Sequence, residues 1–366
     1  MFVLITLLFS FSAQRPKSEG LKDIFANSYY IGVALNSSQV NSSDVKVNSV
    51  IWDNFNSLSP ENGLKWQLVH PEIDRYNFEF GDEYVALGER IGAFTIGHCL
   101  VWHQQVPSWV FLNEHNGQLS KDALISRMEQ HIETVVGRYK GKIHGWDIVN
   151  EAFNEDGSFR ESDWYKIAGE DYIKAAFRKA QEVDPEAELY YNDYNVWKTS
   201  KRKGILDFAK GMVAEGIQVD AIGMQGHYQL DSPTLQEIEQ GIIDIHEAGF
   251  KVMITELDVD VLPRPKRAEG ADLNMNFANS DEYNPYREGI TAEAEAKLAE
   301  RYAAIFKIYE KHKDKINRVT FWGLGDSTSW LNNFPVRGRT NYPLLFDRNL
   351  DPKSTLIEKI ASVVNK

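Results

Sequence analysis

Short apolar runs recur along the whole chain, and they constrain its fold more than any other feature of the sequence. Their length and their content of β-branched and aromatic residues are typical of buried strands. Eight such runs can be traced, at residues 29–35, 57–60, 94–102, 143–149, 188–191, 221–225, 252–255 and 319–323. Any fold of this chain must therefore bury many short strands together.

Amphipathic stretches lie between most of these runs, with apolar residues three and four positions apart as on one face of a helix. The clearest examples are residues 121–139, 164–183, 201–215, 233–248 and 291–312. Strands that alternate with helices favour parallel pairing through βαβ units. Eight repeats in 366 residues predict an α/β fold, a (β/α)8 TIM barrel whose active site lies at the C-terminal strand ends.

The chain contains no linker rich in Pro, Gly or Ser, so we expect one catalytic domain over residues 20–366. One stretch, Leu262–Gly289, has no clear period and contains several Pro, Gly, Asn and Asp residues. It is long for a connector between two elements. Because it follows the seventh predicted strand, we expect it to overhang the strand ends, with a disordered insertion as the alternative.

The first residues, Met1 to Ala13, form an apolar run that is too short to span a bilayer. The run resembles the apolar region of a signal peptide, although no Lys or Arg precedes it. We therefore expect residues 1–19 to be a signal peptide with a short tail, and the protein to be secreted or periplasmic. The alternative is a cytosolic chain with an apolar start.

The formal net charge of −13 argues against nucleic-acid binding, which depends on Lys and Arg clustered against phosphates. A neutral polysaccharide is compatible with this charge. Cys99 is the single cysteine, so the chain can form no internal disulfide and no cysteine-based metal site. We expect Cys99 to be a small buried apolar residue.

Two of the predicted strands end in a glutamate, Glu151 after Asn150 and Glu256 after Thr255. Because the C-terminal strand ends of a barrel meet at one face, the two carboxyl groups should share a pocket. A glycosidase that retains anomeric configuration needs one carboxylic acid and one carboxylate nucleophile, about 5–5.5 Å apart. The two strand ends therefore favour a retaining glycosidase.

The other strand ends add side chains that suit a sugar. Sugar hydroxyls need polar partners, and sugar rings need flat aromatic faces such as that of Trp. The residues at these ends are Asn36, Glu61, Asn62, Lys65, His98, Trp102, His103, Asn192, Gln225, His227, Asp258 and Trp322, with Trp330 further on. We expect the strand ends, with both glutamates, to lie on one side of the barrel.

A metal or nucleotide site is the main alternative use of these residues. His98, His103 and His227 could join a carboxylate in a zinc site, but no pair has the spacing of metal ligands on one helix. No phosphate-binding loop and no dinucleotide fingerprint is present. We therefore expect no metal and no cofactor.

Five segments in order resemble the signature segments of family 10 glycoside hydrolases, the retaining endo-β-1,4-xylanases. They are Pro60-Glu61-Asn62-Gly63-Leu64-Lys65-Trp66, Gly97-His98-Cys99-Leu100-Val101-Trp102-His103, Trp146-Asp147-Ile148-Val149-Asn150-Glu151, Tyr191-Asn192-Asp193-Tyr194 and Ile254-Thr255-Glu256-Leu257-Asp258. The resemblance runs from about Asn36 to Trp330. Cys99 departs from the family pattern in a way that concerns packing, and Leu262–Gly289 leaves the substrate preference open.

The resemblance implies a role for each matching residue. Glu151 would be the general acid/base, with the raised pKa, and Glu256 the nucleophile. Toward the non-reducing end, Glu61, Asn62 and Lys65 would bind the next sugar, and Trp330 would lie over the glycone. The subsite of the cleaved sugar would be lined by His98, Trp102, Asn150, Gln225, His227 and Trp322, and we count Asn192 among the substrate-binding residues.

Several alternatives stay open. The expected partners of the chain are xylan and xylo-oligosaccharides, without nucleic acid or membrane, and we expect a monomer. A β-1,4-glucanase or an exo-acting relative would use the same barrel, and a silent glycan-binding barrel is disfavoured because both glutamates are present. We expect His227 to hydrogen-bond Glu256, whereas Asp258 could orient His227 or pair with an arginine. Trp146 and Asp147 are assigned to packing and internal hydrogen bonds.

Overall fold

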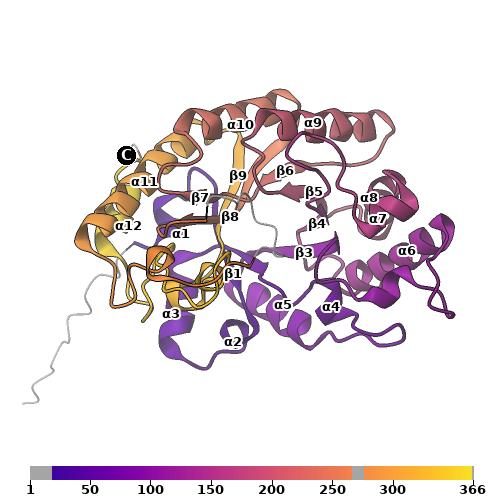
Figure 1. The fold of residues 1–366 in the computed structure, drawn as a ribbon, viewed down its shortest axis with the longest axis horizontal. Helices are drawn as coiled ribbons and strands as arrows, with labels where there is room; N and C mark the ends of the chain where they lie inside the picture. Colours follow the sequence, from indigo (N-terminus) through magenta and orange to yellow (C-terminus); the bar gives the residue numbers. More distant parts are fainter. Residues whose placement is uncertain (1–18, 266–275, 365–366) are drawn as a thin grey trace, which may run out of the picture.

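A computed structural model of the chain describes residues 19–265 and 276–364. Eight parallel strands form a closed ring with the helices on its outside (Figure 1). Pairing of β6 with β8 and of β1 with β9 closes the ring. Its strands are β1 (Tyr30–Leu35), β2 (Ser57–Pro60), β3 (Phe94–Trp102), β4 (Gly145–Asn150), β5 (Glu188–Asp193), β6 (Ala221–Met224), β8 (Lys251–Asp260) and β9 (Ile316–Phe321). The prediction of a (β/α)8 barrel is confirmed.

The ninth strand, β7 (His227–Gln229), was not predicted as a strand of its own. It pairs only with the distal part of β8, where His227 lies opposite Asp258 and Gln229 opposite Asp260. β8 therefore extends beyond the ring of strands, toward the side on which the active site is expected.

Three of the longer helices, α6, α10 and α11, start at hydroxyl side chains that cap their first turn. Ser120 accepts a hydrogen bond from the N–H of Ala123, and Thr234 forms a reciprocal capping box with Glu237. The helices are α1 (Leu21–Ile24), α2 (Ser37–Val40), α3 (Val45–Asn54), α4 (Trp66–Val69), α5 (Glu79–Ile91), α6 (Lys121–Arg138), α7 (Asp163–Ala168), α8 (Asp171–Val183), α9 (Thr199–Ala214), α10 (Leu235–Glu247), α11 (Ala292–Lys311) and α12 (Ser354–Ala361).

One predicted helix is wrong in its extent. The apolar period across residues 164–183 predicted one helix, but the structure has two, α7 and α8. Gly169 follows α7 with φ +61° and ψ −153°, a backbone conformation that ends the helix and that glycine adopts without strain. The apolar face continues across the break, which is why the period alone did not reveal it.

The inside of the ring is filled by side chains. Ile96, Tyr190, Ala221 and Met253 form a cluster separate from the main core. Arg318 of β9 lies beside the Tyr190 ring of β5 and the sulfur of Met253 in β8, so these residues meet across the ring. The strand ends are therefore the floor of a cleft and not the mouth of a pore.

The stretch Leu262–Gly289 is only partly described. Its residues 266–275 fall outside the described part, and the remainder contains one 3-10 turn, Asp281–Tyr283. The predicted signal peptide also lies outside the described residues, apart from Glu19. Across residues 19–265 and 276–364, no helix is long and apolar enough to cross a membrane.

Candidate active site

A cleft of about 500 Å³ opens at the C-terminal ends of the strands. Both predicted catalytic glutamates line it, together with all but one of the predicted substrate-binding residues. The lining residues are Glu61, Asn62, Lys65, His98, Trp102, Gln105, Asn150, Glu151, Gln225, His227, Glu256, Trp322 and Trp330. The fold thus brings residues from all parts of the sequence to one cleft.

Glu151 directly follows β4 and is buried, with a left-handed backbone at φ +59°. Such a conformation is unfavourable for a residue with a side chain and is found more often at functional sites. The indole N–H of Trp102 donates to Glu151 Oε2 at 2.9 Å, and Gln225 Nε2 donates to Oε1 at 3.0 Å. Arg160 Nε donates to the backbone oxygen of Glu151 at 2.9 Å. Both carboxyl oxygens and the backbone of Glu151 are therefore fixed.

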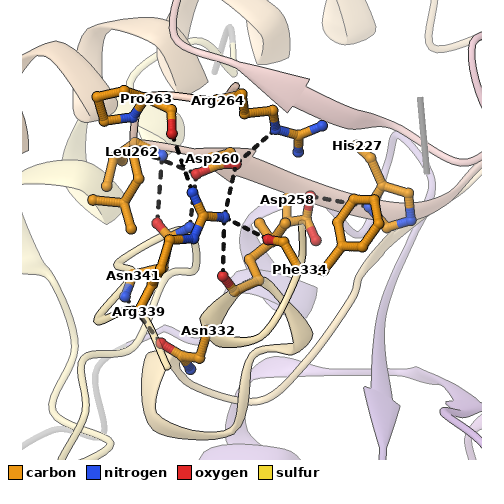
Figure 2. Close-up of polar contacts among 12 residues, drawn as sticks. His227, Asp258, Asp260, Leu262, Pro263, Arg264, Asn332, Phe334, Arg339 and Asn341 are labelled. Carbon is orange, nitrogen blue, oxygen red and sulfur yellow. Dashed lines mark hydrogen bonds and ion pairs between the residues drawn. The ribbon is translucent and has the colours of Figure 1, made fainter. Parts of the chain in front are cut away.

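Glu256 lies within β8 and is held from two sides. Asn192 Nδ2 donates to Glu256 Oε1 at 2.8 Å, and His227 Nε2 lies 3.0 Å from Oε2. The other ring nitrogen of His227, Nδ1, lies 3.0 Å from Asp258 Oδ1 (Figure 2). Of the two roles left open for Asp258, the structure supports the one in which it orients His227.

The two glutamates differ in pKa. Burial is the main cause that raises the pKa of Glu151 to about 6, and the negative charge of Asp193 raises it further. Burial also raises the pKa of Glu256, but the hydrogen bond from His227 and the positive charges of His98, His227 and Lys65 outweigh it and leave this pKa below 4.5. At a pH between these values, Glu151 is protonated and Glu256 is ionised.

His227 supports the ionised state of Glu256. Burial lowers the pKa of His227, but the charge and hydrogen bond of Asp258, and then those of Glu256, raise it to about 9. The imidazole is therefore protonated at neutral pH and donates to a carboxylate at each nitrogen.

Amide side chains connect the two glutamates. Asn150 Oδ1 accepts from Asn192 Nδ2 at 2.9 Å and lies 3.4 Å from Gln225 Nε2. Asn192 is completely buried and does not line the cleft, although it was predicted to bind substrate. Its place is behind the wall, where Thr255 donates to its carbonyl oxygen at 2.6 Å and fixes the orientation of its amide.

A polar group lies at the side of the cleft formed by the loop after β2. Lys65 Nζ donates to Asn62 Oδ1 at 3.0 Å, and Asn62 Nδ2 donates to Glu61 Oε1 at 3.2 Å. Lys65 Nζ also lies 4.7 Å from the centre of the Trp102 ring. Burial raises the pKa of Glu61, although the charge of Lys65 opposes this. The group presents several donors and acceptors to a ligand within a small area.

Aromatic and histidine rings form another part of the wall. Trp322 meets the ring of His98 edge-on at 5.3 Å and that of His227 at 6.4 Å. His98 Nδ1 is fixed by Asp147 Oδ2 at 2.9 Å. Asp147 was predicted to form internal hydrogen bonds, and this one is made to His98, a residue that lines the cleft.

Some strand-end residues lie elsewhere than expected, and one lining residue was missed. Gln105 lines the cleft with φ +44°, three residues after the end of β3, where no periodic pattern marked it. Asn36 caps α2, and His103 does not line the cleft. No described residue of Leu262–Gly289 lines the cleft either. Among the described residues, no three His, Cys, Asp or Glu side chains are arranged to hold a metal ion.

The arrangement can carry acid and nucleophilic chemistry in one cleft. Glu151 holds a proton that it can give to a leaving oxygen, and Glu256 is an ionised carboxylate that can attack carbon. The polar group near Lys65 and the tryptophan rings can bind a hydroxylated ring compound beside both.

Comparisons with known proteins agree with this chemistry. The family model of glycosyl hydrolase family 10 matches residues 20–362. An endo-1,4-beta-xylanase A of Xylanibacter ruminicola is 44% identical over 359 residues, which cover 98% of this chain and 97% of that protein. An endo-1,4-beta-xylanase of Geobacillus stearothermophilus is 39% identical over 342 residues, covering 91% and 95%.

Solved structures give the same result. A GH10 endoxylanase retrieved from a sugarcane soil metagenome superposes with a TM-score of 0.91 at 45% identity, over 94% of this chain and all of that one. The xylanase XynB of Paenibacillus barcinonensis, in complex with a conduramine derivative, has a TM-score of 0.84 at 37% identity, over 94% and 99%.

Proposed function

The chain belongs to glycosyl hydrolase family 10, and we propose that it is an endo-1,4-β-xylanase that cleaves internal β-1,4-xylosidic bonds of xylan. The observation that carries this proposal is the pair of buried glutamates in one cleft whose pKa values are shifted in opposite directions. Xylan is proposed as the substrate because the relatives that match nearly the whole chain are named xylanases.

The proposed mechanism is a double displacement that retains anomeric configuration. Glu256 attacks C1 of the sugar and forms a glycosyl ester, while Glu151 gives its proton to the departing oxygen. A water molecule then attacks C1, Glu151 takes the proton of that water, and the ester bond to Glu256 breaks. This mechanism predicts carboxyl groups about 5–5.5 Å apart, whereas inversion would need about 6.5–9.5 Å.

The walls of the cleft suggest how a xylan chain lies in it. We place the cleaved sugar against His98, Trp102 and Trp322, whose rings line the same cleft as both carboxyl groups. The hydrogen-bonded group of Glu61, Asn62 and Lys65 then takes the hydroxyls of the next sugar toward the non-reducing end. Trp330 covers the glycone from the side of the loop after β9.

The test is hydrolysis of soluble xylan beside carboxymethylcellulose, with the released sugars sized over time. An endo-xylanase releases a range of xylo-oligosaccharides from xylan and little from the cellulose derivative. Release of xylose alone would replace the endo assignment by an exo-acting one, and faster release from the cellulose derivative would make the chain a glucanase. Binding without any release would leave only a glycan-binding barrel.

The stereochemistry is decided by proton NMR of the first product formed. A β-anomer from the β-linked substrate supports retention. An α-anomer contradicts the double displacement and removes the nucleophilic role of Glu256.

We also propose export, with residues 1–19 as a signal peptide and a short tail. The apolar run from Met1 to Ala13 supports this, and the family match starts just after it, at residue 20. Expression of the full chain should yield a mature protein in the medium or periplasm, and N-terminal sequencing of that protein checks it. An unprocessed chain that stays in the cytoplasm would contradict the proposal.

A further inference from the structure

Arg339 joins two loops at the side of the cleft. Its side chain is completely buried, and its guanidinium donates to the carbonyl oxygens of Pro263, Leu331 and Phe334, the first two at 3.2 Å (Figure 2). Pro263 lies just after β8, whereas Leu331 and Phe334 belong to the loop after β9. Arg339 therefore links the two loops through their backbones.

Arg339 is itself anchored to the strand that carries Glu256. Its Nη2 lies 3.5 Å from Oδ2 of Asp260, the last residue of β8. Asp260 is fully buried and also accepts from Arg264 Nε at 2.8 Å and from Asn341 Nδ2 at 2.7 Å. Because each carboxylate oxygen has two donors nearby, this end of β8 is a rigid base for the loop that follows β9.

That loop carries Trp330, which lines the cleft. Leu331 and Phe334, whose carbonyls Arg339 holds, are close neighbours of Trp330 in sequence. The Phe334 ring also stacks on the Trp330 ring at 4.5 Å with an angle of 20° between them. On its cleft side, the indole N–H of Trp330 donates to Asp258 Oδ2 at 2.7 Å. The ring is thus fixed at its edge by Asp258 and at its face by Phe334.

We propose that Arg339 is a positioning residue for Trp330, and that substrate affinity in the cleft depends on it. Arg339 touches no part of the cleft and acts through the backbone of Leu331 and Phe334. Lysine cannot replace it here, because Nη1 donates to Pro263 while Nη2 donates to Leu331 and Phe334, and one ammonium group cannot occupy both positions. The inference rests on the proposed function only for the choice of substrate.

The first test is Arg339→Lys, assayed on soluble xylan. We expect KM to rise about tenfold while kcat changes by less than about twofold, because Trp330 loses its place but both glutamates keep theirs. A purely structural arginine would lower the melting temperature and leave KM unchanged, which would overturn the proposal.

Arg202→Lys is the matched control. Arg202 is as buried as Arg339, donates to the carbonyl oxygens of Val196 and Trp197 at 3.0 and 2.7 Å, and pairs with Asp244 at 2.7 Å. None of these residues lines the cleft. We expect a similar loss of thermal stability and an unchanged KM. An equal rise of KM in this control would also overturn the proposal.

A double-mutant cycle with Trp330→Ala identifies the route. If Arg339 acts through Trp330, Arg339→Lys should change kcat/KM about tenfold in the original chain and less than about twofold when residue 330 is alanine. Equal effects in both backgrounds would contradict the inference. Should Arg339→Lys not fold, Phe334→Leu removes the stacked ring instead, and the same non-additivity with Trp330→Ala is expected.

The proposed function can fail separately. If the original chain releases no sugar from xylan, xylanase activity is disproved. The affinity for xylotriose, measured by calorimetry, then replaces kcat/KM in the same double-mutant cycle. Additive effects of the two substitutions on this affinity would again refute the role of Arg339.

Discussion

The ends of β4 and β8 each carry one buried glutamate, but different neighbours surround the two side chains. Glu151 accepts hydrogen bonds from two neutral groups, an indole and an amide, and the charges that act on it most are carboxylates. Glu256 accepts from the charged ring of His227, and cations dominate around it. Burial acts on both in the same direction, so the neighbouring charges decide which glutamate holds a proton.

The difference originates in the adjacent strands. β5 ends in Asp193, a buried carboxylate whose charge raises the pKa of Glu151. β8 instead continues past Glu256 to Asp258, which holds His227 against Glu256. Glu151 thus lies near a carboxylate that raises its pKa, whereas Glu256 receives a positive charge that its own strand helps to hold.

Exchanging the two glutamates for alanine gives the largest expected effect. Glu256→Ala should lose at least roughly 10⁴-fold in kcat on every substrate, because no covalent intermediate can form. Glu151→Ala should be nearly inactive on xylan but should still form the intermediate with an aryl glycoside whose leaving group needs no proton. Steady-state and burst kinetics on both substrates measure this difference.

Azide sharpens that experiment, because a small anion needs no general base. It should accelerate turnover of Glu151→Ala on the aryl glycoside and yield a β-glycosyl azide. Reversed roles would exchange the products, with a β-glycosyl azide from Glu256→Ala and an α-glycosyl azide from Glu151→Ala.

Removal of the cation beside Glu256 is next in size. His227→Asn should lower kcat/KM about tenfold to a hundredfold, the value of a buried hydrogen bond to a charged group. The pKa of Glu256 should also rise, so that activity is lost at a higher pH as the solution is made acidic. The pH profile of kcat/KM measures both effects.

His312→Asn is the control for that substitution, because His312 Nε2 also lies against a glutamate, at 2.7 Å from Glu239 Oε1. Neither residue of this pair lines the cleft, so the pH profile of kcat/KM should not move. An acid limb that stays in place in His227→Asn would show that another group keeps Glu256 ionised.

The opposite pKa shifts should also appear in stability. The pKa of Glu151 is about 6 in the folded chain and about 4.5 when unfolded, so ionisation costs the folded state about 2 kcal/mol above pH 6 and nothing well below pH 4.5. Relative to the original chain, Glu151→Gln should gain that amount as the pH rises through this window. Denaturant unfolding near pH 4 and near pH 7.5 measures it.

Glu256→Gln should have the opposite pH dependence. The lowered pKa of Glu256 means that its carboxylate stabilises the folded chain at neutral pH and loses this effect as the pH falls. The free energy of unfolding of Glu256→Gln should therefore fall furthest below that of the original chain near neutral pH. The same sign for both variants would contradict the difference between the two strand ends.

The smallest expected effect comes from Asp193→Asn. Loss of this negative charge should lower the pKa of Glu151, so that activity declines at a lower pH on the alkaline side and kcat/KM at neutral pH falls a few-fold. Asp326→Asn is a matched control, because both aspartates are buried and lie 2.7 Å from a buried lysine. Asp326→Asn should lose a similar amount of stability but leave the alkaline limb of the pH profile of kcat/KM unchanged.

The sequence predicted the ring of strands because its strands are buried on both faces and therefore appear as continuous apolar runs. The three residues of β7 were not predicted as a strand, because they pair only with the extension of β8 and have no period of their own. The helix break at Gly169 was also not predicted, because the apolar face of α7 continues into α8.

Most of the candidate cleft could be predicted from residues that closely follow strands, and the roles of Lys65 and Trp330, which lie further along in loops, came from the family resemblance. Glu151 and Glu256 could be predicted because each ends an apolar run. Gln105 lies in a loop, and only the folded chain shows that it lines the cleft. Asn192 lies opposite Asn150 near the end of the neighbouring strand, yet its side chain lies behind the wall, against Glu256. The role of Arg339 depends on carbonyl oxygens, which every residue has, so no residue type in the sequence could indicate it.

The length of β8 has a consequence for engineering. Glu256, Asp258 and Asp260 alternate along it with the buried Leu257 and Val259, so one register places all three carboxylates on the same side. A one-residue insertion upstream would exchange them for aliphatic side chains in a single step. Grafts beyond Val261 leave this alternation intact. Loop transplants intended to change which decorated glycans the enzyme accepts should start after Arg264, because Leu262, Pro263 and Arg264 contact Asp260 and Arg339.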